Sequence, residues 1–295
     1  MLDEQFPVAI CADFVADWTA QTRQTLAQAG FSGPFTDSEV AIAWFNLQNR
    51  AIHPRPRRTL RAKEFQCPPK FARAIADLLA ESEAGRSLIG YLSKKIAFDA
   101  MYTDGLLNDW QVHHFHLGGT VDASGFVKRT GELLFALVAP DTLHLLHVGD
   151  HDDFSRAELF ARIARNWPEL VEQRRLPAAD PKQNLISDVE RSQLRKGRAY
   201  AATVVDDDAF IPAGLGAVMS GTSVKVIVQV QQLYHVLQCL ENYVRDHSPE
   251  FVDEIRRAGY SPDATVRLQL DFGRDRVLAL HPETGASFDI SSALL

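Results

Sequence analysis

The chain has 295 residues, of which 46% are apolar and 23% are charged, so it is long enough for roughly two domains and too apolar for wholesale disorder. With 38 acidic and 31 basic residues its net charge is −7, which excludes a uniformly basic protein that coats nucleic acid and confines any phosphate-binding site to a local basic patch. Its three cysteines are widely separated and form no C-x-x-C pair, which excludes a disulfide framework and a cysteine-rich zinc module.

The sequence predicts neither a secretory signal nor a membrane-spanning helix. The first residues, M-L-D-E-Q, carry acid where a secretory signal carries base. The longest uninterrupted apolar run, Leu133 to Ala139, is far shorter than the ~18 residues of a membrane-spanning helix. We therefore expect a cytoplasmic protein with no membrane association.

The first hundred residues have the pattern of a helical region, because apolar residues recur there at three- and four-residue steps. Helices are predicted over residues 5–30, 37–50, 68–83 and 87–99. Between the second and third of these, Pro54 and Pro56 prevent a helix and predict an extended segment over residues 53–63.

From Trp110 the apolar period changes to that of strands. Strands are predicted over residues 111–117, 132–138 and 142–148, as an antiparallel meander with a tight hairpin at 139–141. Ser155-x-x-Glu158 has the spacing of a capping box and predicts a helix over 154–165 that packs on this sheet.

Residues 173–187 contain two prolines and little periodicity, which is typical of a linker. We therefore predict a first domain over residues 1–175 and a second over 188–295. In the second, a strand is expected near 199–205, a helix over 224–244 and an alternating strand from residue 265. The predicted fold class is α+β: a helical N-terminal region, a small antiparallel sheet with a packed helix, and a second, smaller α/β unit at the C-terminus.

Histidine is concentrated in the predicted sheet: six of the ten histidines lie within residues 113–151. Because side chains alternate along a strand, His114 and His116 should share one face and His113 the other. By the same rule His144 and His147 should point to opposite faces. His151 follows the third strand, so it is expected to meet His116 and the loop of Lys128 and Arg129 at one edge.

This cluster suits two chemistries. Metal-free RNA cleavage needs a base, an acid and a cation beside phosphorus; His114, His116 and His151 could supply the first two, Arg129 the third, and Lys128 could bind substrate. Alternatively, His114-x-His116 with His151 could hold zinc in a metal-dependent hydrolase. Residue spacing leaves both open. A third interpretation is a non-catalytic interaction protein, such as an antitoxin, immunity or structural component, in which the histidines only pack.

The extended segment over 53–63 is the most basic surface in the sequence. This segment suits contact with a nucleic-acid backbone. The alternative interpretation is a solvated loop that forms salt bridges with acidic residues of the chain. The substrate-binding candidates in it are Arg55, Arg57, Arg58 and Arg61.

Several stretches resemble a group of bacterial proteins of uncharacterised function that share the pattern ndW-x-(I/V)-HH-x-HLG … R … LLF … H … WPE. They are L-S-K (92–94), D-G-L-L-N-D-W-Q-V-H-H-F-H-L-G (104–118), K-R-T-G-E-L-L-F-A (128–136), H-V-G-D-H (147–151) and N-W-P-E-L (166–170). The similarity covers residues 42–170.

The order of elements also resembles the RelE/barnase/EndoU-like class of small ribonucleases, many of them toxins. This resemblance implies a metal-independent endoribonuclease with His114, His116 and His151 as acid and base and Arg129 as phosphate clamp, and no cofactor. Such toxins are shorter and basic, whereas this chain is longer and acidic. The expected function is thus an RNA-cleaving hydrolase of toxin–antitoxin or phage-defence type, with an antitoxin or defence component as protein partner; homo-oligomer formation is left open.

Overall fold

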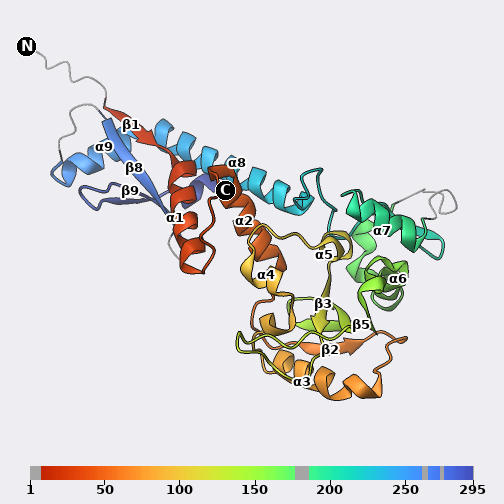
Figure 1. Cartoon of the computed structure of the whole chain (residues 1–295). Helices are drawn as coiled ribbons and strands as arrows, with labels where there is room; N and C mark the ends of the chain where they lie inside the picture. The colour runs from red at the N-terminus through yellow and green to blue at the C-terminus, as the bar shows by residue number, and fades with distance from the viewer. Residues whose placement is uncertain (1–7, 177–185, 261–264, 273–275, 295) are drawn as a thin grey trace, which may run out of the picture. The chain divides into compact units, whose positions relative to one another are not determined.

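The computed structural model describes residues 8–176, 186–260, 265–272 and 276–294 (Figure 1). The chain divides into two compact units. The larger unit is residues 42–227, and the smaller unit combines the described residues up to 41 with those from 228 onward. Helices combine with sheets of mainly antiparallel strands, which confirms the predicted α+β class.

A four-stranded sheet in the order β2-β5-β4-β3 forms the centre of the larger unit. Its strands are β2 (Arg58–Arg61), β3 (Val112–His116), β4 (Leu133–Val138) and β5 (Thr142–Gly149). Strands β3, β4 and β5 form the predicted antiparallel meander. The predicted extended segment adds β2 as an edge strand parallel to β5, so the sheet is mixed rather than purely antiparallel.

Helices cover both faces of this sheet (Figure 1). Helix α3 (Ala72–Glu83), which follows a 3-10 turn at Pro69–Phe71, packs on the face that carries Phe115. Helix α6 (Ala157–Asn166) packs on the face that carries Phe135. His114 and His116 share one face, as predicted, and because Phe135 lies opposite His114 in the ladder, this is the α6 face.

Short helices connect α3 to β3. They are a 3-10 turn at Ile89–Tyr91, α4 (Lys94–Phe98) and α5 (Gly105–Trp110), the first two in place of the one helix predicted over 87–99. Asp104 begins α5 as its N-cap, and its Oδ1 accepts hydrogen bonds from the backbone N–H groups of Leu106 and Leu107. Gln111 ends α5 in the left-handed conformation, with φ 59° and ψ 25°, and β3 begins at the next residue.

The predicted capping box at Ser155 and Glu158 is wrong. Residues His151–Ser155 form a 3-10 helix, and α6 begins after Arg156 without a side-chain cap. The capping box is instead made by Asp150 and Asp153, one element earlier. These carboxylates satisfy the first free N–H groups at the point where β5 ends, so the chain turns there rather than at Ser155.

The two units do not divide at the predicted boundary. Beyond residue 185, α7 (Asp188–Lys196) and the hairpin of β6 (Thr203–Val205) and β7 (Asp208–Phe210) belong to the larger unit. Arg195 of α7 pairs with Asp109, and the Leu176 N–H donates to the Ala209 carbonyl at 2.8 Å. The described residues on either side of the predicted linker thus pack on the larger unit. Residues 177–185 of the linker lie outside the described part of the chain.

The smaller unit contains a sheet in the order β1-β8-β9-β10. Its strands are β1 (Ala9–Ala12), β8 (Thr265–Phe272), β9 (Val277–Leu280) and β10 (Ser287–Asp289), and its complete helices are α1 (Phe14–Gln28) and α9 (Ser248–Arg257). Strand β1 pairs in parallel with β8, so the predicted helix over 5–30 begins only at Phe14. The unit at the C-terminus is therefore completed by N-terminal residues.

Two helices run from one unit into the other: α2 (Asp37–Arg50) and α8 (Val224–Asp246). Both confirm their predictions, over 37–50 and 224–244. In the described part of the chain, no helix combines the length and the apolar character needed to cross a membrane.

Candidate active site

The four predicted acid/base and phosphate-binding residues gather at the end of β3. His116 pairs with Leu133 and Leu133 with Gly149, so the ends of β3 and β5 meet in the sheet, and His151 follows two residues later. Arg129, from the β3–β4 connection, donates to the Ser93 Oγ at 3.3 Å. The charges of Arg129 and His151 both act on His114 and on His116. The structure thus brings His114, His116, His151 and Arg129 together.

Phe154 lies between two of the rings in this cluster. Its ring centroid is 4.8 Å from that of His114 and 5.3 Å from that of His151. The His114 and His116 rings are arranged edge to face, with their centroids 6.3 Å apart. His151 and Arg129 are exposed, whereas His114 and His116 are only 5% and 3% exposed. The cluster therefore has a solvent-facing pair and a buried pair.

Burial sets the protonation of the inner histidines. It lowers the pKa of His116 to about 4, and the charges of His114, Arg129 and His151 lower it further. Burial also lowers the pKa of His114, although the carboxylate of Asp104 opposes this effect. Both rings are thus neutral near pH 7.

Asp104 is a member of the site that the sequence analysis missed. Its Oδ2 lies 3.6 Å from the Nδ1 of His114, while its other oxygen caps α5. One carboxylate therefore caps the helix that leads into β3 and also lies beside the His114 ring, without a hydrogen bond to it. Asp directly before Gly-Leu-Leu is a typical N-cap residue, and this pattern could have identified Asp104 from the sequence.

Among the remaining histidines of the sheet, His144 and His147 pack, whereas His113 lies on the α3 face, as its pairing with Ala136 shows. The prediction that His144 and His147 point to opposite faces is wrong, because the β4–β5 register shifts between Phe135 and Ala136. Both rings consequently lie on the α6 face: His144 meets the Trp167 ring at 4.5 Å, and the His147 Nε2 is 3.2 Å from the Asp153 Oδ2.

The basic segment does not join the histidine cluster. Strands β2 and β3 form opposite edges of the sheet, roughly 14 Å apart at three strand spacings. Arg57 is buried, and each nitrogen of its guanidinium donates to a backbone carbonyl, of Ala139, Arg55 or His53. Its guanidinium holds the loop together, away from the histidine cluster, and its substrate-binding role stays a prediction. The other predicted cations, Arg55, Arg58, Arg61 and Lys128, are exposed.

Among the described residues, no three His, Cys, Asp or Glu side chains are placed to share a metal ion, and zinc binding by His114, His116 and His151 stays a prediction. No protein-family model, curated protein or solved structure matches the chain. The resemblances described above therefore stay predictions, and the function has to be argued from this geometry.

Gly118 sets the approach of the Arg129 loop to β3. A Cβ at position 118 would lie 2.0 Å from the Lys128 carbonyl oxygen, whereas one at Gly119 would meet nothing within 4 Å. Gly118→Ala is therefore expected to lower the free energy of unfolding by about 1–3 kcal/mol in urea titrations, because the Lys128 backbone must move. Gly119→Ala is the matched control and should not lower it; equal effects of the two changes would contradict the placement of this loop.

Proposed function

We propose that the larger unit cleaves RNA without a metal ion, using the residues gathered at the end of β3. The observation that carries the proposal is that three imidazoles and a guanidinium, from separate parts of the chain, meet there with two of them exposed. These groups match what phosphodiester cleavage requires: a proton acceptor, a proton donor and a cation.

The burial of each group suggests its role. His116 is neutral and would accept the proton of a ribose 2′-hydroxyl, whose oxygen then attacks phosphorus. Exposed His151 would give a proton to the departing 5′-oxygen, and exposed Arg129 would face the charge that develops on the phosphate. The products are a 2′,3′-cyclic phosphate and a 5′-hydroxyl. His114, beside Asp104, would position the neighbouring rings.

The exposed residues allow a test in which the protein remains folded. We would incubate the chelator-treated full chain with a labelled single-stranded RNA of mixed sequence. His151→Ala and Arg129→Ala are each expected to lower the cleavage rate by roughly 100-fold or more. His235→Ala and Arg73→Ala remove an exposed histidine and an exposed arginine elsewhere and should leave the rate unchanged. Equal rates for all four variants would overturn the proposal.

A further inference from the structure

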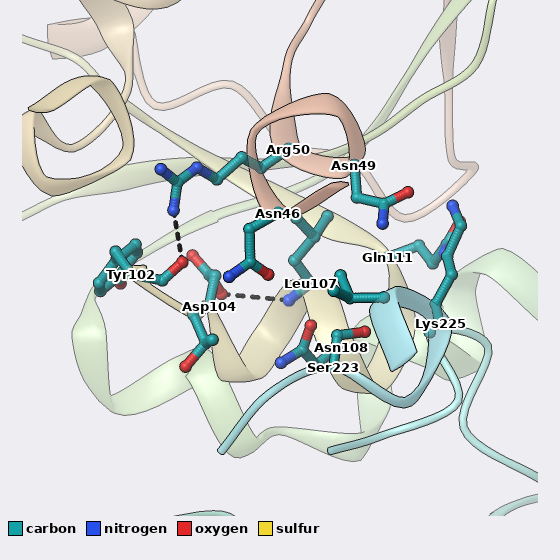
Figure 2. A pocket seen from close by; sticks show the side chains of 13 residues that line it. Asn46, Asn49, Arg50, Tyr102, Asp104, Leu107, Asn108, Gln111, Ser223 and Lys225 are labelled. Carbon is teal, nitrogen blue, oxygen red and sulfur yellow. Dashed lines mark hydrogen bonds between the residues drawn. The ribbon is translucent and has the colours of Figure 1, made fainter. Parts of the chain in front are cut away.

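Two adjoining cavities lie at the other end of the sheet, away from His116. The larger has a volume of about 360 Å³ and is bounded by the start of β3, the end of β4 and the basic segment. The smaller, of about 30 Å³, lies beside α2 and α5 (Figure 2). Asn49, Leu107, Gln111 and Lys225 line both. The two cavities therefore form one cleft with an inner recess.

The cleft is lined by cations that lack a carboxylate partner. Arg50, which is 3% exposed, donates to the carbonyls of Tyr102 and Asp99, and Arg57 donates only to carbonyls. Within the described part of the chain, neither arginine nor Lys225 forms an ion pair with a carboxylate, and no acidic residue lines the larger cavity. Elsewhere in the same unit, buried Arg191 and Arg195 are paired with Asp109. Around the larger cavity, Arg57 and Lys225 thus have no carboxylate beside them among the described residues, whereas Asp104 lines the smaller cavity together with Arg50 and offsets part of its charge.

The inner recess contains polar groups that face an unfilled space. Asn46 is 6% exposed, and its side-chain Nδ2 has no hydrogen-bond partner among the described residues. Figure 2 shows Asn46 at the centre of the recess, with Arg50 and Asp104 on one side and Gln111 and Lys225 on the other. A buried amide N–H without a partner costs free energy that a polar ligand would recover.

Gln111 lines both cavities in a strained conformation. Its φ of 59° places it in the left-handed region, where glycine is the usual residue at the end of a helix. Glutamine makes this backbone conformation less stable than glycine would. We therefore attribute the presence of glutamine to its side chain, which lines both cavities.

We propose that this cleft binds an organic phosphate of mononucleotide size. Unbalanced cations suit the phosphate, amide side chains offer donors and acceptors for a polar group in the recess, and the larger cavity falls within the 300–1,000 Å³ typical of small-molecule sites. The site goes beyond RNA cleavage and does not rest on it.

Calorimetric titration of the full chain tests this proposal, with each of the four ribonucleoside monophosphates, ribose 5-phosphate, inorganic phosphate and adenosine as probes. We expect saturable binding of at least one monophosphate, and binding of adenosine and inorganic phosphate weaker by roughly tenfold or more. No saturable binding of any monophosphate below about 10 mM, or equal binding of inorganic phosphate, would overturn the proposal.

Matched variants locate the binding. Gln111→Gly removes a lining side chain and relieves the left-handed strain, so it should fold at least as well as the wild type and weaken binding by roughly tenfold. Lys225→Gln should weaken it similarly. Arg198→Gly is the control, because it relieves the same strain, at φ 60°, and removes an exposed cation outside the cleft. If Gln111→Gly and Lys225→Gln bind the monophosphate as tightly as the wild type, the assignment of binding to this cleft is overturned. Arg129→Ala should still bind, which separates this site from the RNA-cleaving one.

Discussion

Replacing Asp109 by alanine is expected to lower the free energy of unfolding of the larger unit by about 3–5 kcal/mol. Asp109 is completely buried, and its Oδ2 lies 2.7 Å from Arg195 and 3.9 Å from Arg191. Both guanidinium groups also lie over the Trp110 ring, at 4.2 Å for Arg195 and 5.3 Å for Arg191. Without the carboxylate, the two guanidinium groups beside the Trp110 ring would lose the ion pairs that they form with Asp109.

Urea titrations followed by tryptophan fluorescence would measure this loss. Asp77→Ala is the control, because Asp77 forms an exposed ion pair with Arg73 and its removal should cost less than about 1 kcal/mol. A loss below about 1 kcal/mol in Asp109→Ala as well would show that α7 is not held to α5 by this pair.

Acidification from pH 6.5 to pH 4 is expected to destabilise the larger unit by up to about 3 kcal/mol for each of two histidines. Burial lowers the pKa of His113 and of His116 to about 4, against 6.5 in the unfolded chain. Between these values the unfolded chain binds protons that the folded chain excludes, so stability is full above pH 6.5 and falls with decreasing pH. The loss ends near the folded pKa.

The histidine contribution can be isolated from that of the carboxylates by comparing variants. His116→Gln should reduce the loss of stability between pH 6.5 and pH 4, whereas His235→Gln, which changes an exposed ring, should leave it unchanged. The free energy of unfolding from urea titrations at several pH values provides the comparison. Identical slopes for His116→Gln and the wild type would contradict the burial of His116.

Local patterns predicted the elements that carry their own signal in the sequence. The alternation in residues 112–116 placed His114 and His116 on one face, and prolines marked the extended segment that became β2. Strand β1 was missed because it is defined by pairing with β8, more than 250 residues away, and not by its own pattern. The predicted boundary near residue 180 does not separate the units because α7 and the β6–β7 hairpin contact distant residues of the larger unit, such as Asp109.

Other features had no signal in a single sequence. The shift in register between β4 and β5 places His144 and His147 on one face rather than on opposite faces, and nothing in residues 142–149 marks it. The burial of Arg57 depends on carbonyls of the loop it supports and of the distant hairpin residue Ala139. The cleft combines residues from α2, α5 and α8, so its unbalanced charge becomes visible only once these helices are placed.

The most direct test of RNA cleavage at the end of β3 is an analysis of the products formed by the wild-type chain in the presence of chelator. A labelled RNA and the same sequence with 2′-deoxyribose throughout would be incubated in parallel. We predict that the RNA alone is cut and that its products end in a 2′,3′-cyclic phosphate and a 5′-hydroxyl. An intact RNA, or equal cutting of both strands, would contradict the roles proposed for His116, His151 and Arg129.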